Sequence, residues 1–500
     1  MQRVHIEFQR VQTWLFAVPR LRAMVGANTL LGETLRVKLP HLARQNGRWS
    51  LAQIASHKDY PAAKPKDPLK DYDDPQKDAK YGILSRDGGH FEAQFASGAE
   101  TFAEAARSLI QEQLPGLRYS ITVDHQELPK RQAYLSTELP VLAPCEWTGR
   151  GLASAIIQQG DERSAVSLDI KRRHEAAQRS EQGKAQDLAS LLIAQTKLKH
   201  LQRPQDLDEL VSTGYLALIQ ADGNGIGSAV AGKSEAERAE FFHYNRVLLR
   251  RALRKAINEH CPAEGTAPLI PLMLGGDDLL VICRAEIALP FVVTLCQKLD
   301  EFQSGQDNYN LTLGIGVVIA NSTVPIYRLH EVVEQLVSSA KRRVRGLVAS
   351  NQLARSVVDW AVYTTAWADD PANVRRRDWI CGGAVQRRIL SQRPVDVLGD
   401  KLSTLQGLVG GAQKLYPTKD SLNSRQVPRS QLRYLVDQLP KGRTQAELAW
   451  KELSPKARDA LKAAGVCEIW KQTNDGTLLT ELLDLVEIAE ISLLGVKERR

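Results

Sequence analysis

Three aspartates in the middle of the chain have the residue type and the sequence setting of a metal-dependent site. Asp222 ends the apolar segment YLALIQAD, whereas Asp277 and Asp278 close the tetrapeptide GGDD between PLIPLML and LLVIC. Three carboxylates gathered closely raise one another's pKa and repel unless a cation neutralises them. Such a trio therefore predicts hard divalent ions with oxygen ligands, namely two Mg²⁺ or Mn²⁺ ions bound by Asp222, Asp277 and Asp278.

The chemistry that fits two such ions is nucleotidyl transfer. A pair of ions about 4 Å apart ionises an attacking ribose 3'-hydroxyl, orients the α-phosphate and stabilises the leaving pyrophosphate, so the carboxylates act as ligands and not as general bases. Lys341, followed by Arg342 and Arg343, is the expected cation for the β- and γ-phosphates. By itself this basic run is equally compatible with a solvated helix face.

Glycines accompany the aspartates on both segments. Gly275 and Gly276 permit a tight turn in which the backbone can approach a triphosphate or a base. The glycines of ADGNGIG form an amide-rich loop suited to phosphates. Asn224 within that loop is either a contact to a base or ribose or simply a turn-forming residue. The predicted nucleotide-binding residues are Gly223, Asn224, Gly225, Gly227, Gly275, Gly276 and Lys341.

The GGDD tetrapeptide taken alone is a good hairpin turn in any protein. Its context favours a metal site, because it lies between two apolar strands, with a strand ending in Asp upstream and a helix bearing Lys341 downstream.

A βαββαβ order of elements over 214–320 must position these residues. Strands are predicted at both ends of this range and on either side of GGDD, and the segment 234–260 and a segment near 287–303 have apolar residues at helical spacing. Units of this order form ferredoxin-like antiparallel sheets in which the first and third strands are neighbours. The end of YLALIQAD is therefore expected beside the start of LLVIC, which brings the three aspartates together.

The same order of elements occurs once more near the amino terminus, between VHIEFQ and LRYSITVD, interrupted at 57–80 by a Lys-, Asp- and Pro-rich segment that predicts a solvated insertion. The predicted fold class is α+β, with two tandem ferredoxin-like, nucleotide cyclase-like palm domains. The predicted domains are a non-catalytic first palm at 1–125, a mostly helical middle segment at 126–205, a catalytic palm with the GGDD motif at 206–350, and a helical carboxy-terminal domain at 351–500.

Composition and sequence pattern argue against a secreted protein, a membrane-spanning protein and a cysteine-based framework. The chain of 500 residues has a net charge of +8, which permits a nucleic-acid or nucleotide partner without requiring one. The start MQRVHIEFQRV does not have the pattern of a signal peptide, and no run of about 18 apolar residues occurs, so a cytoplasmic protein without a membrane partner is expected. The six cysteines include no CxxC pair, and buried free thiols are expected.

Together these residues resemble the large palm-domain subunit of type III CRISPR effector complexes, the Csm and Cmr large subunit of the Cas-ten type. The matching positions are Asp222 to Asn224, the hairpin at 275–278, and the Ala-Lys pair at Ala340 and Lys341. The opening FQRVQTWLFAVPRLRAMVGANTLL is similar to the family's first palm, and CEWTGRGLASAI to its middle segment. The resemblance implies synthesis of cyclic oligoadenylate from ATP for antiviral defence, triggered by target RNA bound to a guide-RNA complex.

Departures from the family narrow this expectation. The chain begins directly with the first palm and shows no His-Asp dyad, so the HD nuclease activity of many relatives is expected to be missing. Cys145 stands alone where relatives often hold zinc through several cysteines, which puts that metal in doubt. The chain is short for the family, which leaves its membership in a guide-RNA complex open. ATP is the expected partner, and the two alternatives are a subunit that also binds guide-RNA complex subunits and target RNA, or a stand-alone or homodimeric synthase.

Two other functions remain open at this stage. A diguanylate-cyclase-like synthase of cyclic dinucleotides shares the palm and a related turn, although Leu279 stands where that family has Phe. A catalytically silent subunit that binds RNA and proteins would use the carboxylates as a turn or a structural ion site, and the intact Asp222, Asp277, Asp278 and Lys341 weigh against it. The ring size of the product, the activating signal and the role of the carboxy-terminal domain are not fixed by sequence.

Overall fold

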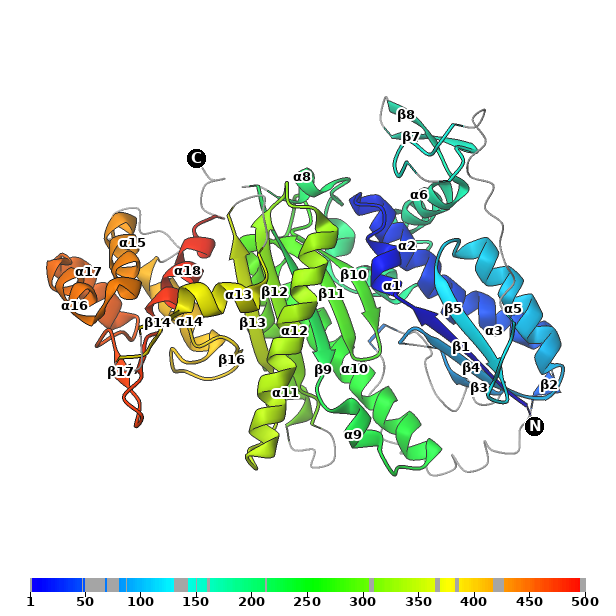
Figure 1. Cartoon of the computed structure of the whole chain (residues 1–500). Helices are drawn as coiled ribbons and strands as arrows, with labels where there is room; N and C mark the ends of the chain where they lie inside the picture. The colour runs from blue at the N-terminus through cyan, green and yellow to red at the C-terminus, as the bar shows by residue number, and fades with distance from the viewer. Residues whose placement is uncertain are drawn as a thin grey trace.

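The computed structural model describes residues 2–46, 48–49, 68–69, 81–86, 88–129, 143–149, 151–159, 162–211, 214–304, 310–364, 369–382, 386–416 and 427–494. The predicted insertion at 57–80 lies outside these ranges except for residues 68–69. Three parts follow one another in a row, namely an amino-terminal unit, a central sheet with its helices, and a carboxy-terminal part (Figure 1). No helix in the described ranges combines the length and apolar composition needed to cross a bilayer.

The central sheet contains the four strands predicted for residues 214–320. They are β9 (Tyr215–Gly223), β10 (Leu269–Gly275), β11 (Asp278–Arg284) and β12 (Leu313–Asn321). They lie in the order β10-β11-β9-β12, and each neighbouring pair is antiparallel. The first and third strands are therefore adjacent, as in a palm, and their ends can meet at one edge.

Two further strands extend this sheet beyond residue 350. β13 (Val357–Tyr363) pairs in parallel with β12, and β16 (Val395–Asp396) pairs antiparallel with β13. A parallel neighbour requires a crossover connection, and α12 (Ile326–Ala349) supplies it. The central sheet thus has six strands and not the four of the predicted ferredoxin-like unit.

Helices cover both faces of the central sheet because its strands are apolar on both sides. Ala217 and Ile219 of β9 face the core formed with α10 (Glu235–His260) and α11 (Ala285–Gln303), whereas Leu216 and Leu218 face α12 and the amino-terminal unit. α10 begins at a capping box, in which Ser234 and Glu237 exchange hydrogen bonds between side chains and backbone N–H groups. The short helix α9 (Ile226–Val230) precedes α10.

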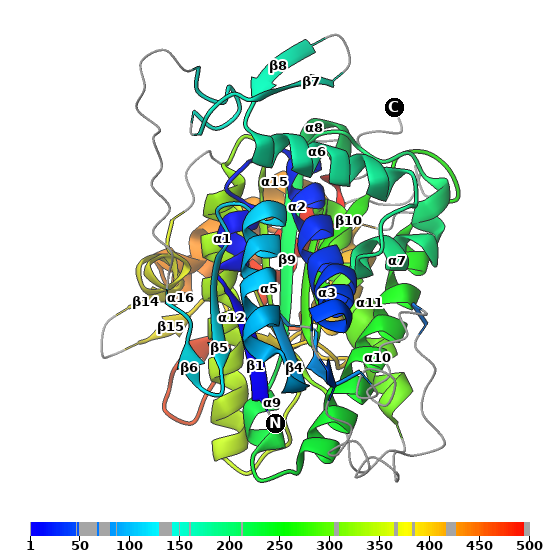
Figure 2. The same cartoon turned by 90° about the vertical axis from the view of Figure 1, so that its right-hand side faces the viewer.

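The amino-terminal unit repeats the strand order of the central sheet. β1 (Gln2–Gln9) lies between β4 (His90–Ser97) and β5 (Arg118–Val123), and both pairings are antiparallel. Figure 2 shows α2 (Leu21–Glu33) and α5 (Ala99–Gln113) in front of this sheet. The smaller elements are α1 (Val11–Leu15), a π-helical turn at Thr34–Lys38, α3 (Leu39–Asn46), β2 (Arg48–Trp49), β3 (Ile83–Ser85) and β6 (Gln126–Glu127).

The middle segment combines helices with a hairpin. The hairpin of β7 (Ala155–Gln159) and β8 (Glu162–Val166) departs from the mostly helical segment predicted there, because its strands are short and partly polar and carry little periodic signal. α6 (Leu168–Glu181) packs so closely on α2 that a Cβ at Gly26 would lie 1.8 Å from the carbonyl oxygen of Arg173. The remaining elements are α7 (Leu188–Ala194), a 3-10 helix at Lys197–His200 and α8 (Leu207–Leu210).

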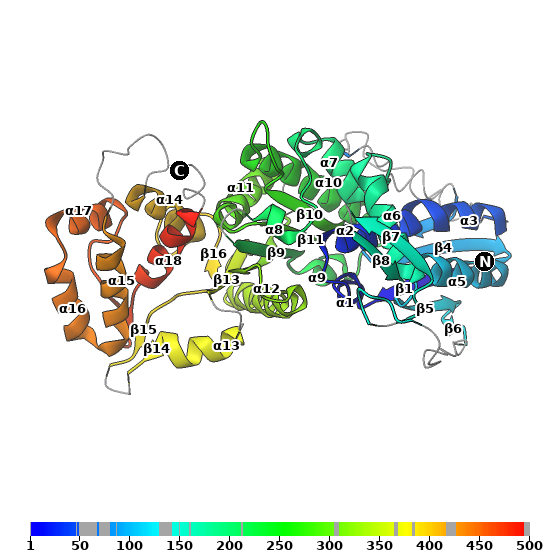
Figure 3. The ribbon, with the colours of Figure 1, turned by 90° about the horizontal axis from the view of Figure 1, so that it is seen from above.

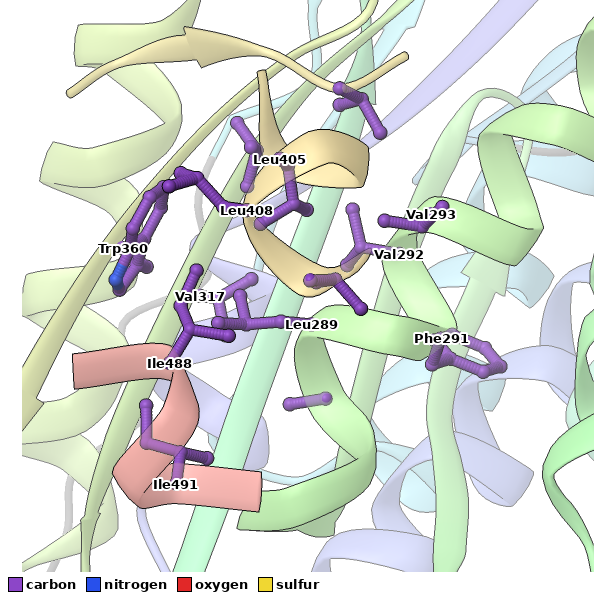
Figure 4. Packing of buried hydrophobic residues seen from close by; sticks show 14 of the residues in the cluster. Leu289, Phe291, Val292, Val293, Val317, Trp360, Leu405, Leu408, Ile488 and Ile491 are labelled. Atoms are coloured by element: carbon purple, nitrogen blue, oxygen red, sulfur yellow. The ribbon is translucent and has the colours of Figure 1, made fainter. Parts of the chain in front are cut away.

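The carboxy-terminal part consists of helices and a small sheet, and lies at the opposite end from the amino-terminal unit (Figure 3). Figure 4 shows Leu408 and Ile488 packed with Leu289 of α11 in one shared core. The helices are α13 (Pro371–Val374), α14 (Leu405–Leu415), α15 (Arg429–Gln438), α16 (Arg443–Glu452), α17 (Pro455–Ala463) and α18 (Leu482–Ser492). The short turns and strands are a π-helical turn at Arg375–Trp379, a 3-10 helix at Leu439–Lys441, β14 (Ile380–Cys381), β15 (Arg388–Ile389), β17 (Lys471–Gln472) and β18 (Leu478–Leu479).

Candidate active site

The register of β9 against β11 gathers the three aspartates at one end of the central sheet. Ala221 is paired with Leu279, and Gly275 closes the hairpin opposite Asp278. Asp222 is therefore one residue beyond the last β9–β11 pair, where its carboxyl group is close enough to that of Asp278 to raise the pKa of Asp278. The side chain of Asp277, in the turn itself, lies beside Gly223 on the other strand.

The carboxyl groups disfavour one another's ionisation. Burial raises the pKa of Asp278 to about 8, and the neighbouring charges of Asp222 and Asp277 act in the same direction. The pKa of Asp277 is also raised, first by burial and then by Asp222. A divalent cation bound among these carboxyl groups would favour their ionised forms, so the cluster is suited to binding one.

The nearest cation is Lys341, whose ammonium group forms an ion pair with Asp222. Lys341 projects from α12, which packs along β12 and β9 and so brings a residue distant in sequence to the end of β9. Both side chains stay about one-third exposed, with relative accessibilities of 27% for Lys341 and 31% for Asp222. Lys341 is thus part of the carboxylate cluster itself.

Gly223 determines how closely β9 and the GGDD turn approach each other. A Cβ at this position would lie 2.5 Å from Asp277 Oδ2 and 2.8 Å from Ile226 Cγ1. The backbone of Gly223 also acts against the rise in the pKa of the Asp277 carboxyl group. The sequence predicted a phosphate contact for this glycine, and the structure adds a second reason for it, namely the space it leaves for Asp277.

Asn224 is held by Thr312, a residue that was not among the predicted site residues. Its backbone N–H donates to the Thr312 carbonyl oxygen at 2.8 Å, and its Nδ2 donates to Thr312 Oγ1 at 3.1 Å. Its Oδ1 atom is buried and has no hydrogen-bond partner among the described residues. Gly314, paired with Asp222 in the register, leaves room for the Lys341 side chain, because a Cβ there would lie 2.7 Å from Lys341 Cγ.

The remaining predicted glycines lie around the same strand ends. Gly225 and Gly276 have left-handed backbone conformations, with φ of 66° and 58°, which glycine adopts without strain. Gly227 is exposed in α9, a helix of only five residues. Gly275 ends β10, where it lines a cavity together with Asp278.

That cavity lies between the amino-terminal unit and the central sheet. It has a volume of about 500 Å³, in the range of small-molecule binding sites. Gly275 and Asp278 line one side, and the turn at Gly88 and Gly89 lines the other. Glu334 of α12 also reaches it. A ligand bound there would contact both parts of the chain.

The carboxylate cluster fits a divalent metal by the chemistry of its donors. All three predicted ligands offer oxygen atoms, and their mutual repulsion is what a dication relieves. Among the described residues, no group of three or more His, Cys, Asp or Glu side chains is already arranged as a metal site. The ammonium group of Lys341 lies on the Asp222 carboxylate, where a cation would bind.

Comparisons with known proteins identify relatives of the segment that contains these residues. Residues 215–349 match the family described as Cas10/Cmr2, second palm domain, which confirms the resemblance to the large palm-domain subunit of type III effectors. A search of curated proteins found no match. Similar solved structures include a Csm1-Csm4 cassette with cA4 (11% identity, 98% of this chain and 70% of that chain, TM-score 0.47) and one with AMPPNP (12%, 98% and 69%, 0.48).

Proposed function

We propose that this chain is a type III CRISPR-like cyclic oligoadenylate synthetase whose second palm, residues 206–350, joins ATP molecules 3' to 5' and releases pyrophosphate. One observation carries the proposal, namely that Asp222, Asp277 and Asp278 meet at the end of two adjacent strands in a segment that matches a second palm domain. The amino-terminal unit, whose first strand does not end in Asp and whose hairpin lacks the GGDD sequence, acts as a non-catalytic first palm.

In this proposal the residues of the chain bind and orient the reactants. Asp222, Asp277 and Asp278 hold two Mg²⁺ or Mn²⁺ ions, which supply an ionised ribose 3'-hydroxyl and stabilise the charge that develops on pyrophosphate. Lys341 places a positive charge near the β- and γ-phosphates. The turn at Gly275 and Gly276 lets the backbone approach the nucleotide closely, since no side chain stands in the way.

The cavity between the two units is the proposed site of the second ATP molecule. A 3'–5' linkage needs two nucleotides held so that the hydroxyl of one faces the α-phosphate of the other. Asp278 and Gly275 border both the carboxylate cluster and this cavity, which the amino-terminal unit closes from the other side. Guide-complex subunits and target RNA are the proposed partners that switch synthesis on, as the resemblance implies.

Labelled ATP tests the proposal directly. The purified chain is incubated with ATP and Mg²⁺ or Mn²⁺, with and without target RNA and guide-complex subunits, and pyrophosphate and oligonucleotides are measured. Asp277→Ala should lower product formation by about 10³-fold or more, because two-metal sites lose most of their rate without a ligand. Asp208→Ala, at an exposed aspartate of α8, which lies near the opposite end of β9 and β11, is the matched control and should match wild type.

The substrates decide between this function and its alternatives. Product from ATP but not GTP supports oligoadenylate synthesis, whereas a GTP-only product supports a diguanylate-cyclase-like enzyme. No product under any condition would favour a silent subunit that binds RNA and proteins, whereas equal output from wild type and Asp277→Ala would reject the carboxylate cluster as the source of the product. Mass spectrometry of the product gives the ring size.

A further inference from the structure

Lys341 and the predicted metal ions need the same carboxylate. The Lys341 ammonium group is paired with Asp222, and the aspartates beside it carry raised pKa values from burial and mutual repulsion. A lysine in this position neutralises part of the cluster and at the same time covers one of the three predicted ligands. A metal ion can bind Asp222 fully only after the ammonium group has moved away.

An unused hydrogen-bond acceptor lies next to the Lys341 side chain. The Oδ1 atom of Asn224 is buried and lacks a partner among the described residues, a costly state for a polar atom. A Cβ added at Gly314 would lie 2.7 Å from Lys341 Cγ and 3.6 Å from Lys341 Cε. The same Cβ would lie 3.0 Å from Asn224 Oδ1. The lysine stem and the amide oxygen are therefore neighbours across Gly314, where the missing side chain leaves space.

We propose that Lys341 is a two-position latch, which covers Asp222 in the absence of metal and transfers its ammonium group to Asn224 Oδ1 when a divalent ion binds. Thr312 keeps the acceptor in place, because Asn224 donates to it through both its backbone and its side-chain nitrogen. In the second position the lysine satisfies the buried oxygen and frees Asp222 for the ion. The latch deepens the proposed function, since it assigns Asn224, Thr312 and Gly314 to control of the metal site.

Metal affinity without nucleotide tests the latch apart from catalysis. Binding of Mn²⁺ alone to the full chain is measured by electron paramagnetic resonance. Lys341→Met removes the competing ammonium group and should tighten Mn²⁺ binding roughly fivefold, as expected for a partly exposed ion pair. Arg342→Met makes the same change of charge on an exposed neighbouring residue and should not tighten binding. Weaker or unchanged binding in Lys341→Met overturns the latch.

A double-mutant cycle tests the second position of the lysine. Asn224→Ala should weaken Mn²⁺ binding roughly threefold in the wild-type chain, because the ammonium group loses its alternative acceptor, and should have no effect in the Lys341→Met chain. Thr312→Val removes the hydroxyl group that accepts from Asn224 Nδ2 but keeps the Asn224 Oδ1 acceptor. It therefore distinguishes loss of the acceptor from loss of the group that orients it. Equal effects of Asn224→Ala in both backgrounds contradict the transfer.

A crystal of the unaltered chain soaked in Mn²⁺ needs no substitution. Lys341 Nζ within hydrogen-bond distance of Asn224 Oδ1, with Mn²⁺ on Asp222, supports the latch, whereas Nζ still on Asp222 beside a bound ion overturns it. The proposed synthase is judged separately by product formed from ATP. Tighter Mn²⁺ binding by Lys341→Met without any product would leave the latch standing and the synthase rejected.

Discussion

At the scale of single residues, substitution of two glycines of β12 should affect different properties, activity at Gly314 and stability at Gly316. A Cβ at Gly314 meets the flexible Lys341 side chain at 2.7 Å, whereas a Cβ at Gly316 meets the backbone oxygen of Val333 at 2.5 Å and the nitrogen of Val337 at 2.9 Å. We expect Gly314→Ala to lower nucleotide synthesis about tenfold with little change in melting temperature, because the lysine is displaced but the fold is kept.

Gly316→Ala should instead push α12 away from β12 and lower stability by about 1–3 kcal/mol, because backbone atoms cannot yield as a side chain does. Thermal melting and the ATP assay, run on both variants, check the contrast. Gly346→Ala, in α12 with nothing near the added Cβ, is the control, and it should raise stability slightly through helix propensity. Loss of folding in Gly314→Ala would show that this glycine serves packing alone.

The sequence predicts the aspartates of the site better than their surroundings. Asp222, Asp277 and Asp278 stand at strand ends whose pairing follows from the order of elements, so their meeting could be anticipated. Thr312 and Gly314 gain their roles only from the register that pairs Gly314 with Asp222 and Leu313 with Gly223. The local signal was the pair of glycines inside the strand LTLGIGVVIA, because glycine in a strand often marks close approach of another group.

At the scale of elements, α12 joins the two units through His330. This imidazole packs against Phe16, and its Nε2 lies 2.8 Å from Gln12 Oε1 in the amino-terminal unit. Burial lowers the pKa of His330 to about 4, and the nearby charge of Glu331 does not offset it. Glu334 lies one helical turn away, 3.6 Å from the same nitrogen. The contact between the units is therefore built for a neutral imidazole.

Acidification should weaken this contact. The unfolded chain binds a proton on His330 below pH 6.5, whereas the folded chain does not until about pH 4. The contribution of His330 is therefore fully present above pH 6.5 and falls with decreasing pH, reaching a loss of about 3 kcal/mol near pH 4.

Urea unfolding between pH 7 and pH 5 measures the contribution of His330. His330→Gln keeps a donor for Gln12 but cannot titrate, so its free energy of unfolding should fall less than that of wild type. His200→Gln, at an exposed histidine, should follow wild type throughout. Parallel curves for wild type and His330→Gln would rule out His330 as the source of acid sensitivity.

The elements themselves were predictable to different degrees. The long periodic helices α10 and α12 and the apolar strands β9, β11 and β12 follow directly from hydrophobic spacing. β13 was harder to place, because the polar residues 351–356 read as the start of a new domain, and only tertiary pairing with β12 assigns VVDWAVY to the central sheet. The β7–β8 hairpin has strands of five residues, too short for a clear alternation.

At the scale of the whole molecule, one core joins the central sheet to the carboxy-terminal part. Residues of β9, α10 and α11 belong to the same buried cluster as those of α14, α15 and α18. At its edge Arg393 is fully buried, paired with Asp484 at 2.9 Å and with Glu487 at 2.8 Å. Its guanidinium group also lies 4.4 Å from the ring centroid of Trp360 on β13. Arg393 therefore connects α18 to the last long strand of the sheet.

Replacing Arg393 should weaken this connection far more than replacing Arg433, an exposed arginine of α15 that also pairs with α18. Arg393→Met leaves Asp484 and Glu487 without their cation and should cost about 3–5 kcal/mol of unfolding free energy, whereas Arg433→Met, which breaks an exposed pair with Glu490 of α18, should cost less than about 1 kcal/mol. Asp484→Asn added to Arg393→Met should recover part of the loss, because it removes an uncompensated charge.

Urea unfolding followed by tryptophan fluorescence reports the change, since Trp360 flanks the arginine. Equal costs for the two arginine variants would mean that the buried pair does not hold the carboxy-terminal part to the sheet.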